Sequence, residues 1–226
     1  SMELTENTPS TLTTRANTLS TGVYFRLIVF RKSGNNYVFQ SAADYTSNGA
    51  SSPVLKKGKL LTRSGTIRVI GYSFNTTAAL GDIPASYTYN TTKIDIPNMN
   101  NDFMTYDSGD IANVNSLNYN LPVTFKQKLC KLTISISVTG FTSNTISGCT
   151  GVYVKQGGNS TSWVIGSSAV AANTSNTASF NPNTNQTTTI HMVPFASSRT
   201  ITVHFNKLTV GNLIANNADN IDIAST

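Results

Sequence analysis

Residue types that commonly catalyse reactions or bind metals are scarce in this sequence. Of its 226 residues, 12% are charged, two are cysteines and two are histidines. His191 and His204 lie far apart along the chain, and no combination of Cys and His has the spacing of a zinc site. The phosphate-binding patterns GxGxxG and GxxxxGK[ST] are missing. We therefore expect no metal site and no cofactor.

Long apolar runs are also missing. No stretch reaches the roughly 18 consecutive apolar residues that a membrane-spanning helix needs. Helical periodicity is nearly absent, since no window has a sustained i, i+3, i+4, i+7 apolar stripe. Alternating segments are present instead. One face of segment 23–30 carries Val23, Phe25, Leu27 and Val29. The opposite face is also largely apolar, which predicts a strand buried on both sides.

Similar alternation recurs at 65–74, 131–138 and 199–205. Thr, Ser and Asn are abundant between these segments, and the chain has 15 Gly. Many short strands separated by turn residues predict an all-β fold of the β-sandwich type, with room for two sandwiches in series. The polar stretch 107–120 is the best candidate for a linker. A first domain would then cover residues 1–120 and a second would cover 121–226.

The formal net charge of +6 raises the question of nucleic-acid binding. The densest basic group is Lys56, Lys57, Lys59 and Arg63. This group surrounds a glycine, where a solvated turn is the simpler explanation. No module that combines aromatic and basic residues accompanies the charge, so we expect no nucleic-acid partner.

Three aspartates, Asp102, Asp107 and Asp110, lie close together in the sequence. Their spacing does not match an EF-hand loop, and the bidentate glutamate is missing, so a surface turn is favoured over a calcium site. Both histidines fall at positions expected to face outward from strands. Serines are abundant enough to complete a catalytic triad on paper, but no nucleophile elbow supports one. We therefore expect that the protein is not an enzyme.

Cys130 and Cys149 allow two interpretations. They could face each other across a hairpin and form a disulfide in an oxidising compartment. Alternatively, both are small buried apolar residues. The second interpretation is favoured.

Several segments carry strand patterns in a fixed order along nearly the whole chain. The first is GVYFRLIVFRKSGNNYVFQSAADYT, an apolar strand followed by a short turn and another strand. The second is LKKGKLLTRSGTIRVIGYSFNTTAAL, with Gly58, Gly71, Tyr72, Ser73 and Asn75. Then follow DFMTYDSGD, LPVTFKQKLCKLTISI and MVPFASSRTITVHF. In this order the segments resemble the Bacteroidetes fimbrillins, the donor-strand pilins of type V pili. Two departures are Gln127 or Lys128 where that family usually has His, and Cys130 where it usually has Ser or Ala.

The resemblance implies two tandem transthyretin-like (Greek-key) β-sandwich domains, the second shortened at its end. It implies a structural or adhesive subunit of a bacterial surface fimbria. Such a subunit is located at the cell surface and outer membrane, and is exported as a lipoprotein whose signal is not part of this sequence. Its partners would be other fimbrial subunits, an Arg-specific protease and a ligand on a host or bacterial surface.

The resemblance also gives a role to a lone arginine in the polar N-terminal segment. Fimbrillins are cut by an Arg- or Lys-specific protease after their first strand, and a strand of the neighbouring subunit fills the groove that opens. Here Arg15–Ala16 would be the scissile bond and residues 1–15 the removable segment. Residues 4–14 would then pair within the first sandwich, along a groove lined by Val23, Phe25, Leu27 and Val29. The donor strand is not assigned, although segment 220–224 alternates weakly.

An alternative keeps the surface location without polymerisation. In that case the protein is a surface lipoprotein that binds a glycan or another host ligand through a face of a β-sandwich. Aromatic side chains would stack on the sugars. The candidates are Tyr87, Tyr89, Tyr106 and Trp163.

Overall fold

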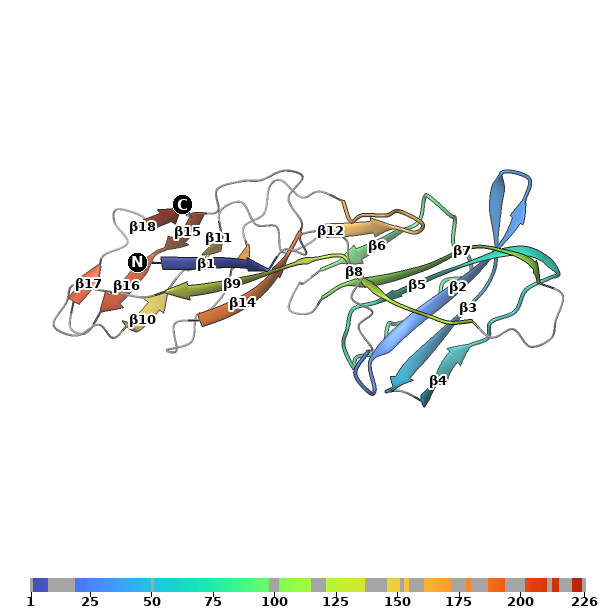
Figure 1. The fold of residues 1–226 in the computed structure, drawn as a ribbon, viewed down its shortest axis with the longest axis horizontal. Coiled ribbons are helices and arrows are strands. Elements are labelled where there is room, and N and C mark those ends of the chain that lie inside the picture. Colours follow the sequence, from blue (N-terminus) through green and yellow to red (C-terminus); the bar gives the residue numbers. More distant parts are fainter. Residues whose placement is uncertain are drawn as a thin grey trace.

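The computed structural model consists of β-strands joined by turns and loops, with no helix in its described part. It describes residues 2–7, 19–49, 51–97, 102–114, 121–136, 146–150, 153–154, 161–171, 178–179, 187–193, 202–210, 213–215 and 221–224. The expected all-β class is confirmed. Within these ranges no helix is long and apolar enough to cross a membrane. Figure 1 shows an elongated molecule with two groups of strands along its long axis.

The larger group is built on a six-stranded antiparallel sheet with the order β4-β3-β2-β5-β7-β8. Its strands are β2 (Tyr24–Ser33), β3 (Asn36–Asn48), β4 (Ser51–Gly58), β5 (Gly65–Ser73), β7 (Met104–Val114) and β8 (Lys126–Gln127). Strands β2 and β5 lie in the middle, and each has a hydrogen-bonded neighbour on both sides.

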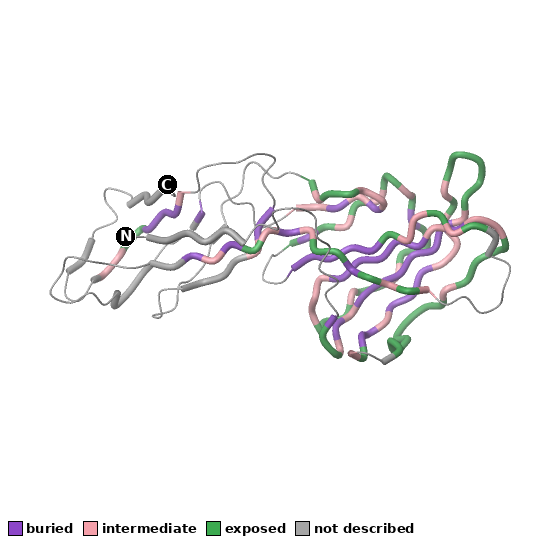
Figure 2. The backbone as a smooth tube through the Cα atoms, viewed as in Figure 1, coloured by how far each residue is buried: buried purple, intermediate pink, exposed green. Residues whose placement is uncertain are grey.

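Both faces of the central strands are buried, as their apolar residues on both faces predict. One face packs Phe25, Leu27, Val29 and Val69 with Leu19 and Phe125. The other face packs Ile28, Phe30, Ile70 and Tyr72. Figure 2 shows buried residues running along these strands. Full burial of one such side chain stabilises the fold by roughly 1.5–3 kcal/mol.

A two-stranded ribbon, β6 (Lys93–Ile96) with β12 (Thr161–Val164), adds to this larger group. Trp163 of β12 is 1% exposed and packs on Phe103 and Tyr72, with ring centroids 5.8 and 6.4 Å apart. Strand β12 belongs to the second half of the sequence, so residues beyond 121 complete the core of the larger group. The division of the chain at residue 120 stays a prediction, and the two halves of the sequence are interleaved in space.

The smaller group contains three sheets, ordered β1-β9-β14, β10-β16-β17 and β13-β11-β15-β18. The first sheet consists of β1 (Met2–Asn7), β9 (Cys130–Ile136) and β14 (Thr187–Met192). The second has β10 (Ile146–Thr150), β16 (Lys207–Val210) and β17 (Leu213–Ala215). The third has β11 (Tyr153–Val154), β13 (Ala178–Ser179), β15 (Thr202–Phe205) and β18 (Ile221–Ala224).

The linker expected at 107–120 is wrong for residues 107–114. These residues belong to β7, which pairs with β5 from Gly65↔Val114 to Ser73↔Met104. The pairing contains two register shifts. Among the polar residues that suggested a linker, Asp107 and Asp110 are exposed side chains of this bulged strand. Residues 115–120 lie outside the described part.

Candidate functional site

The edge of β9 is the part of the fold that bears most directly on the expected assembly mechanism. Strand β9 lies between β1 and β14 and is antiparallel to both. The β1 register runs from Met2↔Ile136 to Asn7↔Lys131. The outer strand of this pairing is thus supplied by the first residues described in the chain. In Figure 1, β1 runs alongside β9 and ends near the junction of the two groups.

The pairing of β1 differs from the expectation that residues 4–14 would pair within the first sandwich. Residues 4–7 lie on β9, in the smaller group. The expected groove strand, β2, already has β3 on one side and β5 on the other. Phe25, Leu27 and Val29 of β2, and Val23 just before it, are all buried in one apolar cluster. No position next to β2 is left for β1, because a strand has only two edges.

The expected processing site, Arg15 and Ala16, lies outside the described residues. Strand β1 ends at Asn7, and the described chain resumes at Leu19. The proposed scissile bond therefore falls in the connection between β1 and the larger group. The pairing of β1 with β9 was not predicted from the sequence, because β1 is only six residues long. The alternation of Met2 and Leu4 with polar residues is a signal that could have indicated this strand.

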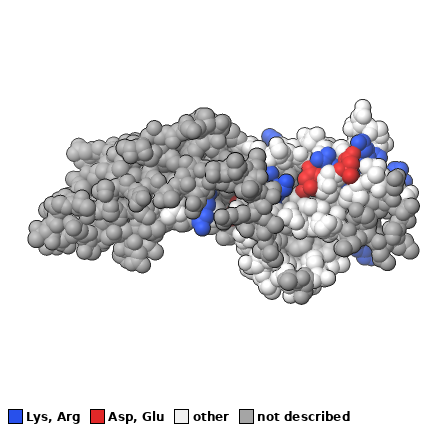
Figure 3. Space-filling view, viewed as in Figure 1, with Lys and Arg blue, Asp and Glu red and all other residues white. Residues whose placement is uncertain are grey.

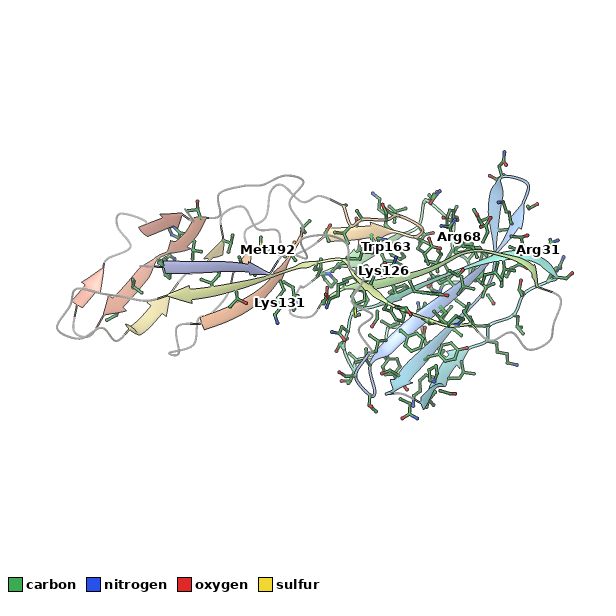
Figure 4. The ribbon with its side chains drawn as sticks, in the orientation of Figure 1. Arg31, Arg68, Lys126, Lys131, Trp163 and Met192 are labelled. Carbon is green, nitrogen blue, oxygen red and sulfur yellow. The ribbon has the colours of Figure 1, made fainter. Side chains whose placement is uncertain are left out.

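The start of β9 is anchored to the larger group. The backbone N–H of Lys128 donates to the carbonyl oxygen of Phe103 at 2.9 Å. Leu129 and Val193, which follow β8 and β14, pack into the same core cluster as Phe103 and Trp163. Strands β9 and β14 therefore both meet the larger group at residues fixed in its core. Figure 4 shows Lys131 and Met192 on these two strands, and Lys126 and Trp163 on the other side of the junction.

Asp102 is the unusual titratable group at this junction. It is 4% exposed, and its Oδ1 atom has no hydrogen-bond partner among the described residues. Burial raises the pKa of Asp102 to about 7, and the nearby backbone amides of Leu129 and Lys128 oppose this rise only in part. The Asp102 carboxyl group therefore loses its proton near neutral pH. It lies just before β7, close to the segment that joins β8 to β9.

The aspartates and His204, the other candidate groups of the sequence, lie in different parts of the fold. Asp107 pairs with Arg68, and Asp110 pairs with Lys32, so the three aspartates do not converge. His204 is buried, contrary to the outward position expected, and its Nε2 lies 3.0 Å from Asn206 Oδ1. The described residues include no group of three or more His, Cys, Asp or Glu side chains able to hold a metal ion.

The cysteines are not arranged as a hairpin. Strand β9, with Cys130, pairs with β1 and β14, whereas β10, with Cys149, pairs with β16 in another sheet. Cys130 carries a thiol, is only half-buried and lies opposite Met192. It is therefore not the core residue that its sequence position suggested.

Three of the four aromatic residues proposed for stacking on sugars are core residues. Tyr87, Tyr106 and Trp163 are 3%, 8% and 1% exposed. Tyr89 is half-buried, and its ring lies 4.5 Å from that of Tyr37. The three buried rings are used mainly for packing, so Tyr89 is the most exposed of the four.

Comparisons with known proteins returned no relatives. No protein-family model, no curated protein and no solved structure matches this chain. The resemblance to the fimbrillins therefore remains a hypothesis that rests on the sequence motifs.

Proposed function

We propose that the protein is a non-enzymatic structural or adhesive subunit of a bacterial surface fimbria, assembled by strand exchange at the edge of β9. The proposal includes two tandem transthyretin-like sandwiches and export as a lipoprotein to the outer membrane. The observation that carries it is the position of β1. An N-terminal strand occupies the outer edge of β9 and is joined to the rest of the chain by the connection that contains Arg15.

Removal of β1 would expose a hydrogen-bonding edge. Strand β9 has seven residues, and the β1 register covers six of them. Backbone N–H and C=O groups that lose their partners recruit another strand, which is the general hazard of an open sheet edge. In strand addition the same main-chain hydrogen bonds supply the affinity. Leu132 and Ile134, 2% and 0% exposed, fix which face of β9 remains buried.

A protease that cleaves after arginine would act as the trigger. Arg15 is the first basic residue of the sequence, so cleavage there separates β1 from the larger group without cutting any described strand. The released segment would then be free to leave β9. The partners in this mechanism are the protease and a second subunit that supplies the new strand.

Limited trypsin treatment followed by size-exclusion chromatography tests the proposal. Cleavage after Arg15 should convert the monomer into oligomers. A synthetic peptide of residues 1–15, added in excess, should return the cleaved protein to the monomeric state because it occupies β9. A peptide of the same composition in scrambled order is the matched control and should have no effect.

The Arg15→Ala variant separates strand exchange from general aggregation. It should stay monomeric after the same treatment. If this variant still forms oligomers, or if the cleaved protein remains a monomer in the absence of the peptide, assembly does not depend on release of β1 and the proposal is wrong.

A further inference from the structure

The larger group carries a pocket of about 600 Å³ beside β7, with both polar and apolar residues in its lining. It is lined by β5 and β7 on one side, by residues 122–128 on another and by the turn 166–168 after β12 on a third. A volume of this size lies within the range of small-molecule sites. The side chains that give the pocket its chemistry are Arg68, Lys126, Lys128, Asp107 and several hydroxyl residues.

The side chains that line this pocket carry a net positive charge. Arg68 donates two hydrogen bonds to the Asp107 carboxylate, Nε to Oδ1 at 2.8 Å and Nη2 to Oδ2 at 2.6 Å. This pair neutralises itself. Lys126 and Lys128 remain, and among the described residues neither has a salt-bridge partner. Figure 3 shows basic and acidic residues alternating across this side of the larger group.

A hydrogen bond to the backbone holds the Lys128 side chain at the pocket. Its ammonium group donates to the carbonyl oxygen of Ser168 at 2.7 Å, which links residue 128 to the turn after β12. Burial lowers the pKa of Lys128, the positive charge of Lys126 lowers it further, and Asp107 partly offsets both. An anion bound between the two lysines would relieve this repulsion.

The rest of the lining is suited to a carbohydrate. Five residues with hydroxyl side chains line the pocket together with the two lysines: Thr105, Ser108, Thr124, Ser167 and Ser168. Hydroxyl groups donate and accept hydrogen bonds, so they match the hydroxyls of a sugar ring. An extended peptide fits less well, because the β5–β7 pairing is bulged between Arg68 and Ile70 and Gly109 adopts a left-handed φ of 65°. Such irregularities prevent regular strand addition.

We propose that this pocket binds an acidic oligosaccharide, with the carboxylate of a uronic-type sugar placed between Lys126 and Lys128. The site lies outside the β9 edge. The proposal of a carbohydrate site does not depend on strand exchange, so it is tested by a separate binding experiment.

Binding to oligosaccharides of matched length tests the inference. The probes are a hyaluronan hexasaccharide, which carries carboxylates, and an N-acetylchitohexaose, which is neutral. Trp163 is the single tryptophan of the chain and lines the pocket, so its fluorescence can report binding alongside calorimetry. We expect the acidic probe to bind at least about tenfold more tightly, the contribution of one charge-assisted hydrogen bond.

Two variants locate the site. Lys126→Gln should weaken binding of the acidic probe about tenfold, because it removes one charge-assisted contact from an exposed residue without touching the core. Lys56→Gln is the matched control. Lys56 is also an exposed lysine, but it lies on β4 at the opposite edge of the six-stranded sheet, so its loss should leave binding unchanged.

Four outcomes would overturn the inference. The first is no binding of the acidic probe, and the second is equal binding of the neutral one. The third is an equal loss of affinity in Lys56→Gln and Lys126→Gln, which would indicate attraction by net charge alone. The fourth is equal or tighter binding of a hexaglutamate peptide, which would assign the pocket to acidic peptides.

Discussion

At the scale of single residues, the burial of a charged side chain determines how much its ion pair contributes to stability. Arg26 lies on the central strand β2 and is 2% exposed. Its guanidinium donates to Asp44 at 2.5 and 2.8 Å and to the carbonyl oxygens of Gly81 and Asp82 at 3.1 and 3.0 Å. Tyr87 also accepts from it, at 2.9 Å. Burial disfavours the charged guanidinium, but the hydrogen bond to Asp44 and the other partners outweigh it and raise the pKa of Arg26.

The contrast with the surface is informative. Lys57 and Asp82 also form an ion pair, but the Asp82 side chain is 97% exposed. Exposed pairs contribute roughly 0–1 kcal/mol because water already solvates both groups. Breaking a buried pair by removing one partner costs about 3–5 kcal/mol. The Arg26 cluster therefore fixes the loop at residues 81–87 to the sheet, whereas the Lys57 pair has little effect on stability.

Asp102 makes stability depend on pH. Its folded pKa of about 7 lies above the ordinary value for aspartate, so the folded state holds this proton more tightly than the unfolded state. The resulting stabilisation is complete below the ordinary pKa of about 4 and is lost as the pH rises through 7. Asp102→Asn, which is always neutral, should therefore raise the free energy of unfolding at pH 8 by a few kcal/mol. The gain should shrink toward zero near pH 4.

Urea unfolding between pH 4 and pH 8 measures this effect. Asp95→Asn is the control, since Asp95 is exposed on β6 and should leave the pH profile of the original chain unchanged. An Asp102→Asn variant whose stability falls with pH as steeply as the original would show that Asp102 is not the group responsible.

At the scale of elements, the β3–β4 pairing depends on one glycine. Gly58 ends β4 with a φ of 75°. A Cβ atom there would collide with the carbonyl oxygen of Ala42 and would lie 2.8 Å from Ile83 Cδ1. Backbone atoms of the paired strand cannot move aside without breaking the ladder. We therefore expect both conformational strain and a clash at this position.

Substitution by alanine separates these two contributions. Gly34, in the β2–β3 turn, has a similar φ of 61°, but nothing lies within 4 Å of its Cβ position. Gly34→Ala should cost about 1 kcal/mol from strain alone, whereas Gly58→Ala should cost about 2–4 kcal/mol. Thermal and urea unfolding of both variants give the comparison. Equal losses would mean that the contact with Ala42 does not matter.

At the scale of the whole molecule, the two groups of strands should differ in their response to the loss of β1. Strands β2 and β5 are enclosed on both edges and buried on both faces, so their amides should exchange most slowly with solvent. Strand β9 depends on β1 for one of its edges. Hydrogen exchange of a chain that starts at residue 16 should therefore increase in β9 and remain unchanged in β2 and β5.

The chain of 226 residues provides the reference for that experiment. Faster hydrogen exchange in β2 after the truncation would show that β1 stabilises the larger group. In that case the edge of β9 would lose its special position in the assembly mechanism.

The strongest sequence patterns were sufficient to predict several elements. The two apolar faces of 23–30 and 65–74 correctly predicted the central strands β2 and β5, and Leu132 and Ile134 are buried on β9 as their alternation predicted. The linker was predicted incorrectly for residues 107–114, and so was the outward position of His204. Polarity marks solvent exposure and not the absence of a strand, and a histidine can be buried when a partner such as Asn206 lies within reach.

The sequence by itself therefore determined the all-β class and the strands of the large core, because the alternation of side chains along a strand is a local property. Only the tertiary structure decided which strands became neighbours. It placed β1 on β9 and not beside β2, inserted Trp163 into the core of the larger group, and brought Arg68, Lys126 and Ser168 to one pocket. These pairings join residues that are far apart in the chain. A short polar strand fits many edges equally well, so packing of the whole molecule selects its partner.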